Sequence, residues 1–176
     1  QPDKPSQRGQ QLHKTPVKIL AEEKKIPALQ PSKLKDASFL SQLSALKPDA
    51  GIVVAYGRII PKEVLQIFPK GLFNIHFSLL PHLRGAAPIQ WAILRVDQKT
   101  GVTSFKIAET LDTGNMIVQK SIGISKNDNA VTLEEKLIPL GIMVLEETLK
   151  KIKDGEAVEI PQTGEISYAP TFKKED

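Results

Sequence analysis

The stretch NIHFSLLPHLRGAAPIQWAIL, residues 74–94, carries the strongest fold signal of the chain and its most unusual residues. It reads as the end of a short apolar strand, a Leu-Leu-Pro stop, a turn of small residues and then a helix. Asn74 and His76 stand where a buried strand is normally Val, Ile or Leu. Because side chains alternate along a strand, Asn74 and His76 point to one face, and Phe73 and Ile75 to the other.

The face shared by Asn74 and His76 is expected to lie at the open carboxyl end of the strand, where α/β sheets bind ligands. An amide and an imidazole side by side can both donate to one oxygen, as the oxyanion of an acyl transfer requires. Asp112 is the best placed carboxylate to orient or charge the histidine. The sequence also allows a hydrogen-bonded structural role for His76 and an ordinary turn role for Asp112.

Strands and helices alternate along the rest of the chain. Thr15 caps one predicted helix, and Thr132 with Glu135 forms a capping box for the last one, which should end near Gly155 and be kinked or split by Pro139. This order predicts an α/β fold with a mostly parallel sheet, helices on both faces and an antiparallel edge. Helices are predicted at 16–26, 36–47, 61–68, 87–94 and 132–155, strands at 50–57, 71–77, 100–109 and 114–124, and loop or extended chain at 1–14 and 163–176.

The composition is that of a soluble globular domain. Hydrophobic residues make up 40% of the 176 residues, and no apolar run approaches the ~20 residues of a membrane span. Cysteine is absent, which rules out disulfides, thiolate metal sites and cysteine nucleophiles and suits a reducing cytosol. The three histidines show no metal-ligand spacing, so no metal is expected. Dinucleotide, serine-hydrolase and phosphate-loop motifs are missing too, and Ser78 is a poor candidate nucleophile because it extends alongside His76.

The net charge of +4 is small, but the start of the chain is basic. Up to Lys18 it holds Lys4, Arg8, Lys14 and Lys18 against Asp3 alone. A solvated leader would explain this charge, and so would a contact for a polyanion such as RNA.

Five segments together resemble the methionyl-tRNA formyltransferases, a branch of the 10-formyltetrahydrofolate-dependent formyltransferase family. They are QPDKPSQRGQQLHKTPVK, KPDAGIVVAYGRIIPKEVL, NIHFSLLPHLRGAAPIQWAIL, TGVTSFKIAETLDTGNMI and SYAPTFKKED. The resemblance implies a Rossmann-like formyltransferase fold and an enzyme of translation initiation, cytoplasmic and monomeric. Such an enzyme transfers a formyl group from its co-substrate 10-formyltetrahydrofolate to the amine of methionyl initiator tRNA.

The resemblance also implies roles for single residues. Asn74 would hydrogen-bond the formyl oxygen, His76 would stabilise the oxyanion, and Asp112 would hold His76 in its working state and help remove the amine proton through water. The folate would be bound by Ser78, Leu79, Leu80 and Pro81 and by the backbone around Val53, Ala55, Tyr56 and Gly57. Lys4, Arg8 and Lys14 would bind the tRNA.

Several positions depart from the family pattern. Phe77 is expected to crowd the folate entrance, Asn115 replaces a carboxylate near the site, and Gln10 and Gln11 replace a basic pair that meets tRNA. Relative to the family, the chain is expected to lack the first strand and a C-terminal barrel. Residues 1–176 then form one truncated catalytic domain, with a mobile loop at 1–14 and a linker at 163–176. Alternatives are another formyltetrahydrofolate-dependent formyltransferase or hydrolase, or an inactive folate-binding fragment.

Overall fold

The computed structural model describes residues 1–6 and 11–172. The chain divides into two compact units, each described by itself. The first comprises Gln1–Pro48 and Ile60–Ile67, and the second Asp49–Ile59 and Phe68–Asp176.

The first unit contains a short antiparallel ribbon and three helices. Residues 4–6 and 11–13, predicted to be loop, instead pair through their backbones as two short strands despite their polar sequence. Thr15 caps the next helix as predicted, its hydroxyl oxygen accepting a hydrogen bond from the Lys18 N–H at 3.3 Å. The elements are β1 (Lys4–Ser6), β2 (Gln11–His13), α1 (Pro16–Glu23), α2 (Ala37–Ala45) and α3 (Lys62–Leu65).

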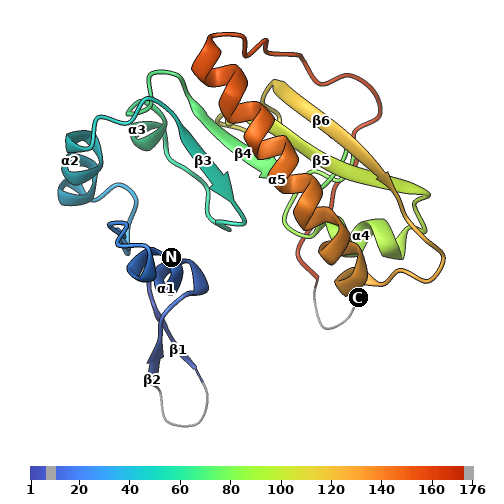
Figure 1. Ribbon diagram of the computed structural model, residues 1–176, viewed down its shortest axis with the longest axis horizontal. Helices are drawn as coiled ribbons and strands as arrows, with labels where there is room; N and C mark the ends of the chain where they lie inside the picture. Colours follow the sequence, from blue (N-terminus) through green and yellow to red (C-terminus); the bar gives the residue numbers. More distant parts are fainter. Residues whose placement is uncertain (7–10, 173–176) are drawn as a thin grey trace. The chain divides into compact units, whose positions relative to one another are not determined.

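The second unit is built on a four-stranded sheet in the order β3-β4-β5-β6 (Figure 1). The predicted parallel pair is β3 with β4, and the predicted antiparallel edge is β5 with β6. The β4–β5 pair is also antiparallel, so the sheet is mixed and its antiparallel part is larger than the sequence predicts. The elements are β3 (Gly51–Val54), β4 (Leu72–His76), α4 (Pro88–Leu94), β5 (Lys99–Lys106), β6 (Met116–Gly123) and α5 (Ala130–Asp154).

Helix α5 covers one face of this sheet (Figure 1). Its buried side chains recur at helical spacing and pack on the apolar face of the strands, which gives the unit its hydrophobic core. The buried apolar residues of that core include Phe73, Ile75, Val102, Ile117, Val118, Leu133, Leu137, Val144 and Ile152.

Two predictions about α5 need correction. The helix begins before the predicted capping box: Asn129 is the N-cap, and Thr132 accepts a hydrogen bond from the Asn129 N–H at 3.0 Å. Pro139 lies inside one uninterrupted helix and does not split it, because the packed face of α5 outweighs the one backbone hydrogen bond that proline removes. The helix ends as predicted at Gly155, whose φ of 74° is left-handed. Within the described residues, no helix combines the length and apolarity needed to cross a membrane.

The chain after α5 returns along the sheet as a strap, defined here as residues 160–172. Ile160 bridges Met116, and Tyr168 bridges Arg84. The strap also accepts a hydrogen bond from the Trp91 indole at 2.8 Å. Residues 163–172, predicted to be a linker, are therefore bonded to the second unit.

Candidate active site

Asn74 and His76 lie on the face of β4 that points away from α5. Phe73 and Ile75 belong to the core under α5, so alternation directs Asn74 and His76 to the opposite face. Phe105 of β5 stands opposite Asn74 in the ladder, and its ring meets the His76 ring edge to face with centroids 6.4 Å apart. His76 is 5% exposed, whereas Asn74 is half-buried.

Asp112 reaches His76 from the other end of β4. Because β5 runs antiparallel to β4, the loop that follows β5 begins beside Phe73 and folds back over the sheet. Its Asp112 has a φ of 51°, a left-handed conformation that aspartate tolerates better than most residues. The Asp112 carboxylate accepts a hydrogen bond from the Gly85 N–H at 2.7 Å and lies 3.9 Å from Nδ1 of His76.

The hydrogen bond on the far side of the His76 ring fixes where its proton resides. Nε2 lies 2.9 Å from the carbonyl oxygen of Leu83, and a carbonyl only accepts, so Nε2 carries the hydrogen. Burial lowers the pKa of His76 below its ordinary value, although the Asp112 charge and the Leu83 bond oppose that shift. The ring is therefore neutral near pH 7, with a lone pair at Nδ1 on the side of Asp112.

This arrangement suits acyl chemistry. Among the described residues, no side-chain hydrogen bond engages the Asn74 amide, which leaves its donors for an oxygen placed over the sheet. His76 can accept a proton at Nδ1 beside a carboxylate that would stabilise the resulting charge. The structure thus brings together the three residues that the sequence nominated from two distant segments.

The segment after β4, predicted to bind the folate, is held by side chains of neighbouring strands. The Thr103 hydroxyl donates to the Ser78 carbonyl at 2.7 Å and accepts from the Leu80 N–H at 3.2 Å. Gln119 donates to the Leu80 carbonyl at 3.1 Å. The Ser78 hydroxyl itself donates to the carbonyl of His82, so it stabilises the turn and is not directed at a substrate. The Leu80–Pro81 peptide bond is cis.

Phe77 does not crowd the site. Its ring packs on the α5 side of the sheet, where a Cβ at Gly141 would lie 3.3 Å from it. The prediction failed although strand alternation already assigns Phe77 to the face opposite His76. Asn115 donates to the Glu159 carboxylate at 3.1 Å, and Lys106 pairs with the same carboxylate at 2.7 Å. The pair with Lys106, followed by the Asn115 bond, lowers the pKa of Glu159.

The other predicted binding residues are placed as follows. Ala55 and Gly57 are exposed with positive φ, and Val53 and Tyr56 are half-buried. In the first unit, Lys14 forms an exposed ion pair with Glu22 at 2.7 Å, and their hydrogen bond raises the pKa of Lys14. Arg8 and Gln10 lie outside the described residues, as do the side chains of Lys4 and Gln11.

Two residues that sequence reasoning missed complete the surroundings of Asp112. Gln162 of the strap donates to the carbonyl oxygens of Asp112 and Gly114, both at 2.8 Å. The buried Arg84 guanidinium donates to Oε1 of Gln162 from Nε at 3.1 Å and from Nη2 at 2.6 Å. Gln162 is 50 residues from Asp112 and 78 from Arg84, and no local spacing signals such contacts.

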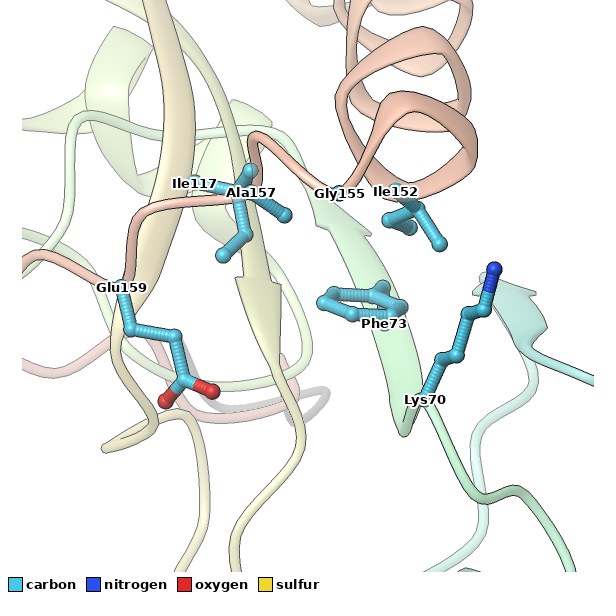
Figure 2. Close-up of a pocket in the computed structure, with 7 residues that line it drawn as sticks. All are labelled: Lys70, Phe73, Ile117, Ile152, Gly155, Ala157 and Glu159. Carbon is cyan, nitrogen blue, oxygen red and sulfur yellow. The ribbon is translucent and has the colours of Figure 1, made fainter.

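A hollow of about 280 Å³ lies elsewhere in the second unit. Figure 2 shows Phe73 and Ile152 projecting into it, with Lys70 and Glu159 at its rim. Phe73 faces α5, so this hollow lies on the opposite side of β4 from Asn74 and His76. Across residues 1–6 and 11–172, no group of three His, Asp or Glu side chains could hold a metal ion.

Most of the chain matches one protein family. Residues 1–149 match the family described as formyl transferase. The chain is 49% identical over its full length to a methionyl-tRNA formyltransferase of Thermodesulfovibrio yellowstonii, and 46% identical over 99% of its length to one of Clostridioides difficile. It spans 57% of the length of each of these relatives.

Solved structures show the same fold. A formyltransferase from Anoxybacillus kamchatkensis, in complex with tetrahydrofolate and a UDP-linked formamido sugar, is 29% identical with a TM-score of 0.70, over 88% of this chain and 79% of that one. A sugar N-formyltransferase from a Shewanella species has a TM-score of 0.74 over 89% of this chain and 60% of that one, at 18% identity.

Proposed function

Because the chain belongs to the formyl transferase family, we propose that it transfers a formyl group from 10-formyltetrahydrofolate to the amino group of methionyl initiator tRNA. It would do so during translation initiation, in the cytoplasm and as a monomer. The observation that carries the proposal is the cluster of Asn74, His76 and Asp112 on one face of the sheet. The identity of 49% with a methionyl-tRNA formyltransferase supports the choice of acceptor.

Each residue of the cluster has a task in this transfer. The amine nitrogen bonds to the formyl carbon, that carbon's bond to the folate nitrogen breaks, and the amine proton passes to the leaving nitrogen. Asn74 donates a hydrogen bond to the formyl oxygen as negative charge develops on it. Neutral His76 takes up the amine proton at Nδ1, its positive charge stabilises the oxyanion, and it then passes that proton to the leaving nitrogen. Asp112, 3.9 Å away, stabilises the charged ring and helps to move the amine proton through water.

Two surfaces would hold the substrates. The folate would lie against Ser78, Leu79, Leu80 and Pro81, whose backbone is fixed by Thr103 and Gln119. It would also lie against the backbone of Val53, Ala55, Tyr56 and Gly57, of which Ala55 and Gly57 are exposed. The half-buried amide of Asn74, which no side chain of the described residues bonds, lies beside a buried imidazole and fits the carbonyl that such a donor presents. The basic residues Lys4, Arg8 and Lys14 would meet the phosphates of the tRNA.

The decisive experiment compares acceptors. The chain is incubated with 10-formyltetrahydrofolate and, in separate reactions, methionyl initiator tRNA, a UDP-linked amino sugar, glycinamide ribonucleotide, or no acceptor. The proposal predicts formyl-methionyl-tRNA as the dominant product. Faster formylation of the sugar or of glycinamide ribonucleotide would assign another transferase, and formate release without an acceptor would assign a hydrolase.

A last arm tests whether the chain is only a folate-binding fragment. Thermal unfolding is followed with and without tetrahydrofolate, because a ligand that binds the folded state raises the midpoint. A raised midpoint without transfer to any acceptor would leave folate binding as the function of this chain.

A further inference from the structure

The strap holds the loop that carries Asp112 through one side chain, Gln162. All four hydrogen-bonding positions of this amide are used. Its two N–H groups donate to the carbonyl oxygens of Asp112 and Gly114, and its oxygen accepts twice from Arg84. The amide cannot turn over, because its N–H groups would then face the Arg84 donors and its oxygen would face two carbonyls.

Arg84 ties Gln162 to the segment that also holds the Asp112 carboxylate. Its neighbour Gly85 donates its N–H to that carboxylate at 2.7 Å. The Asp112 residue is thereby fixed at its carboxylate by Gly85 and at its carbonyl by Gln162, and both ties lead to Arg84–Gly85. Arg84 is 8% exposed, so the guanidinium is a buried anchor for this geometry.

The strap also lies too close to Gly85 for any side chain there. A Cβ at Gly85 would lie 2.5 Å from the Ala169 carbonyl oxygen, and the φ of +128° at Gly85 is one that other residues rarely adopt. The backbone of Arg84 is hydrogen-bonded to Ser167 and Ala169 on the strap. The strap therefore controls both the Gly85 donor and the Asp112 loop.

We propose that Gln162 is a positioning residue of the active site, which holds the Asp112 carboxylate beside His76 for the proposed formyl transfer. This inference rests on the proposed function. Gln162 lies beyond residues 1–149, the part of the chain that matches the family. Residues 1–149 would thus depend on the strap for the position of one of the three proposed reacting side chains.

The test compares Gln162→Ala and Gln162→Glu with Thr163→Ala, which removes the exposed neighbouring side chain on the same strap. Gln162→Glu keeps an acceptor for Arg84 but turns a carboxylate oxygen toward two carbonyls. Both Gln162 variants should lower kcat about 10- to 100-fold, because a displacement of the order of 1 Å is enough for such a loss. The KM for folate should stay within about threefold in both Gln162 variants, because neither substitution changes the proposed folate contacts. Thr163→Ala should match the wild type in both kcat and KM.

A second readout does not depend on turnover. The chain has three histidines, so the ring signals of His76 can be assigned and titrated by NMR. The Asp112 charge raises the pKa of His76. Among the described residues, Arg84 is the other buried charged side chain, and it is bonded to Gln162. Displacing Asp112 should lower the pKa of His76 in both Gln162 variants, toward the value in Asp112→Asn.

The two readouts separate the two proposals. An unchanged His76 titration in folded Gln162 variants overturns the positioning role, whatever the activity. If the Gln162 variants show a lowered pKa of His76 and the wild type formylates no acceptor, the positioning role is supported and the proposed function is overturned. A kcat loss equal in Thr163→Ala would mean that the strap acts only as general support, which also overturns the inference.

Discussion

The Thr103 hydroxyl is the clearest single test of how the substrate-binding segment is held. It is fully buried on β5 and makes three hydrogen bonds, with Ser78, Leu80 and Gln119. Thr103→Val keeps the shape and removes all three. Gln119 retains its bond to the Leu80 carbonyl, but the Leu80 N–H and the Ser78 carbonyl lose their partner.

The size of the effect follows from those two orphaned groups. A buried polar group without a partner costs about 1–3 kcal/mol, so we expect Thr103→Val to lower the free energy of unfolding by about 3 kcal/mol. For a chain of this length that is a fall of about 6–12 °C in Tm. Thr103→Ser is the matched control, since it keeps the hydroxyl and loses one methyl group, at about 1 kcal/mol.

Urea denaturation and thermal melts of the three proteins measure the order of stability. We expect wild type above Thr103→Ser and Thr103→Ser above Thr103→Val, with folate affinity weakest in the Val variant. If Thr103→Val is as stable as Thr103→Ser or more so, the buried bonds of Thr103 do not hold the segment after β4.

Three further predictions concern the surroundings of the site. Burial lowers the pKa of His76, so below about pH 6.5 the unfolded chain binds more protons at this residue and the free energy of unfolding falls as the pH drops. His76→Gln should remove this slope, which is at most ~1.4 kcal/mol per pH unit. If the free energy of unfolding of His76→Gln follows the same pH dependence as that of the wild type, the prediction is wrong. Asn115→Asp should lower the free energy of unfolding by about 0.5 kcal/mol at pH 7, because the new carboxylate faces that of Glu159. Urea denaturation should show that this loss disappears in acid, where the carboxylates are protonated. Gly114→Ala should lower the free energy of unfolding by more than about 3 kcal/mol and reduce transfer, because its Cβ would overlap the Lys106 carbonyl oxygen. Gly123 has open space around it, so the control Gly123→Ala should keep a Tm close to that of the wild type.

The local features of the site were predictable from the sequence. Asn74 and His76 break an apolar strand, and strand alternation places them on one face. The cap at Thr15 and the left-handed end at Gly155 follow from residue type and position. Asp112 was nominated as the best placed carboxylate, and it lies beside His76.

The features that depend on distant contacts were not predictable. The direction of β5 brings the Asp112 loop back from the far end of β4, and no residue pattern specifies that direction. Gln162 and Arg84 meet only because the strap returns across the sheet. The helix over Pro139 stays whole because tertiary packing outweighs local propensity.

The role of His76 in formyl transfer is tested by single-turnover transfer to methionyl initiator tRNA by wild type, His76→Ala and Asp154→Asn, with tetrahydrofolate binding measured on the same samples. Asp154 is an exposed carboxylate at the end of α5 and serves as the control. We expect His76→Ala to lose transfer by at least about 100-fold, while tetrahydrofolate binding and the Asp154→Asn rate stay near those of the wild type. Transfer by His76→Ala at the wild-type rate would contradict that role.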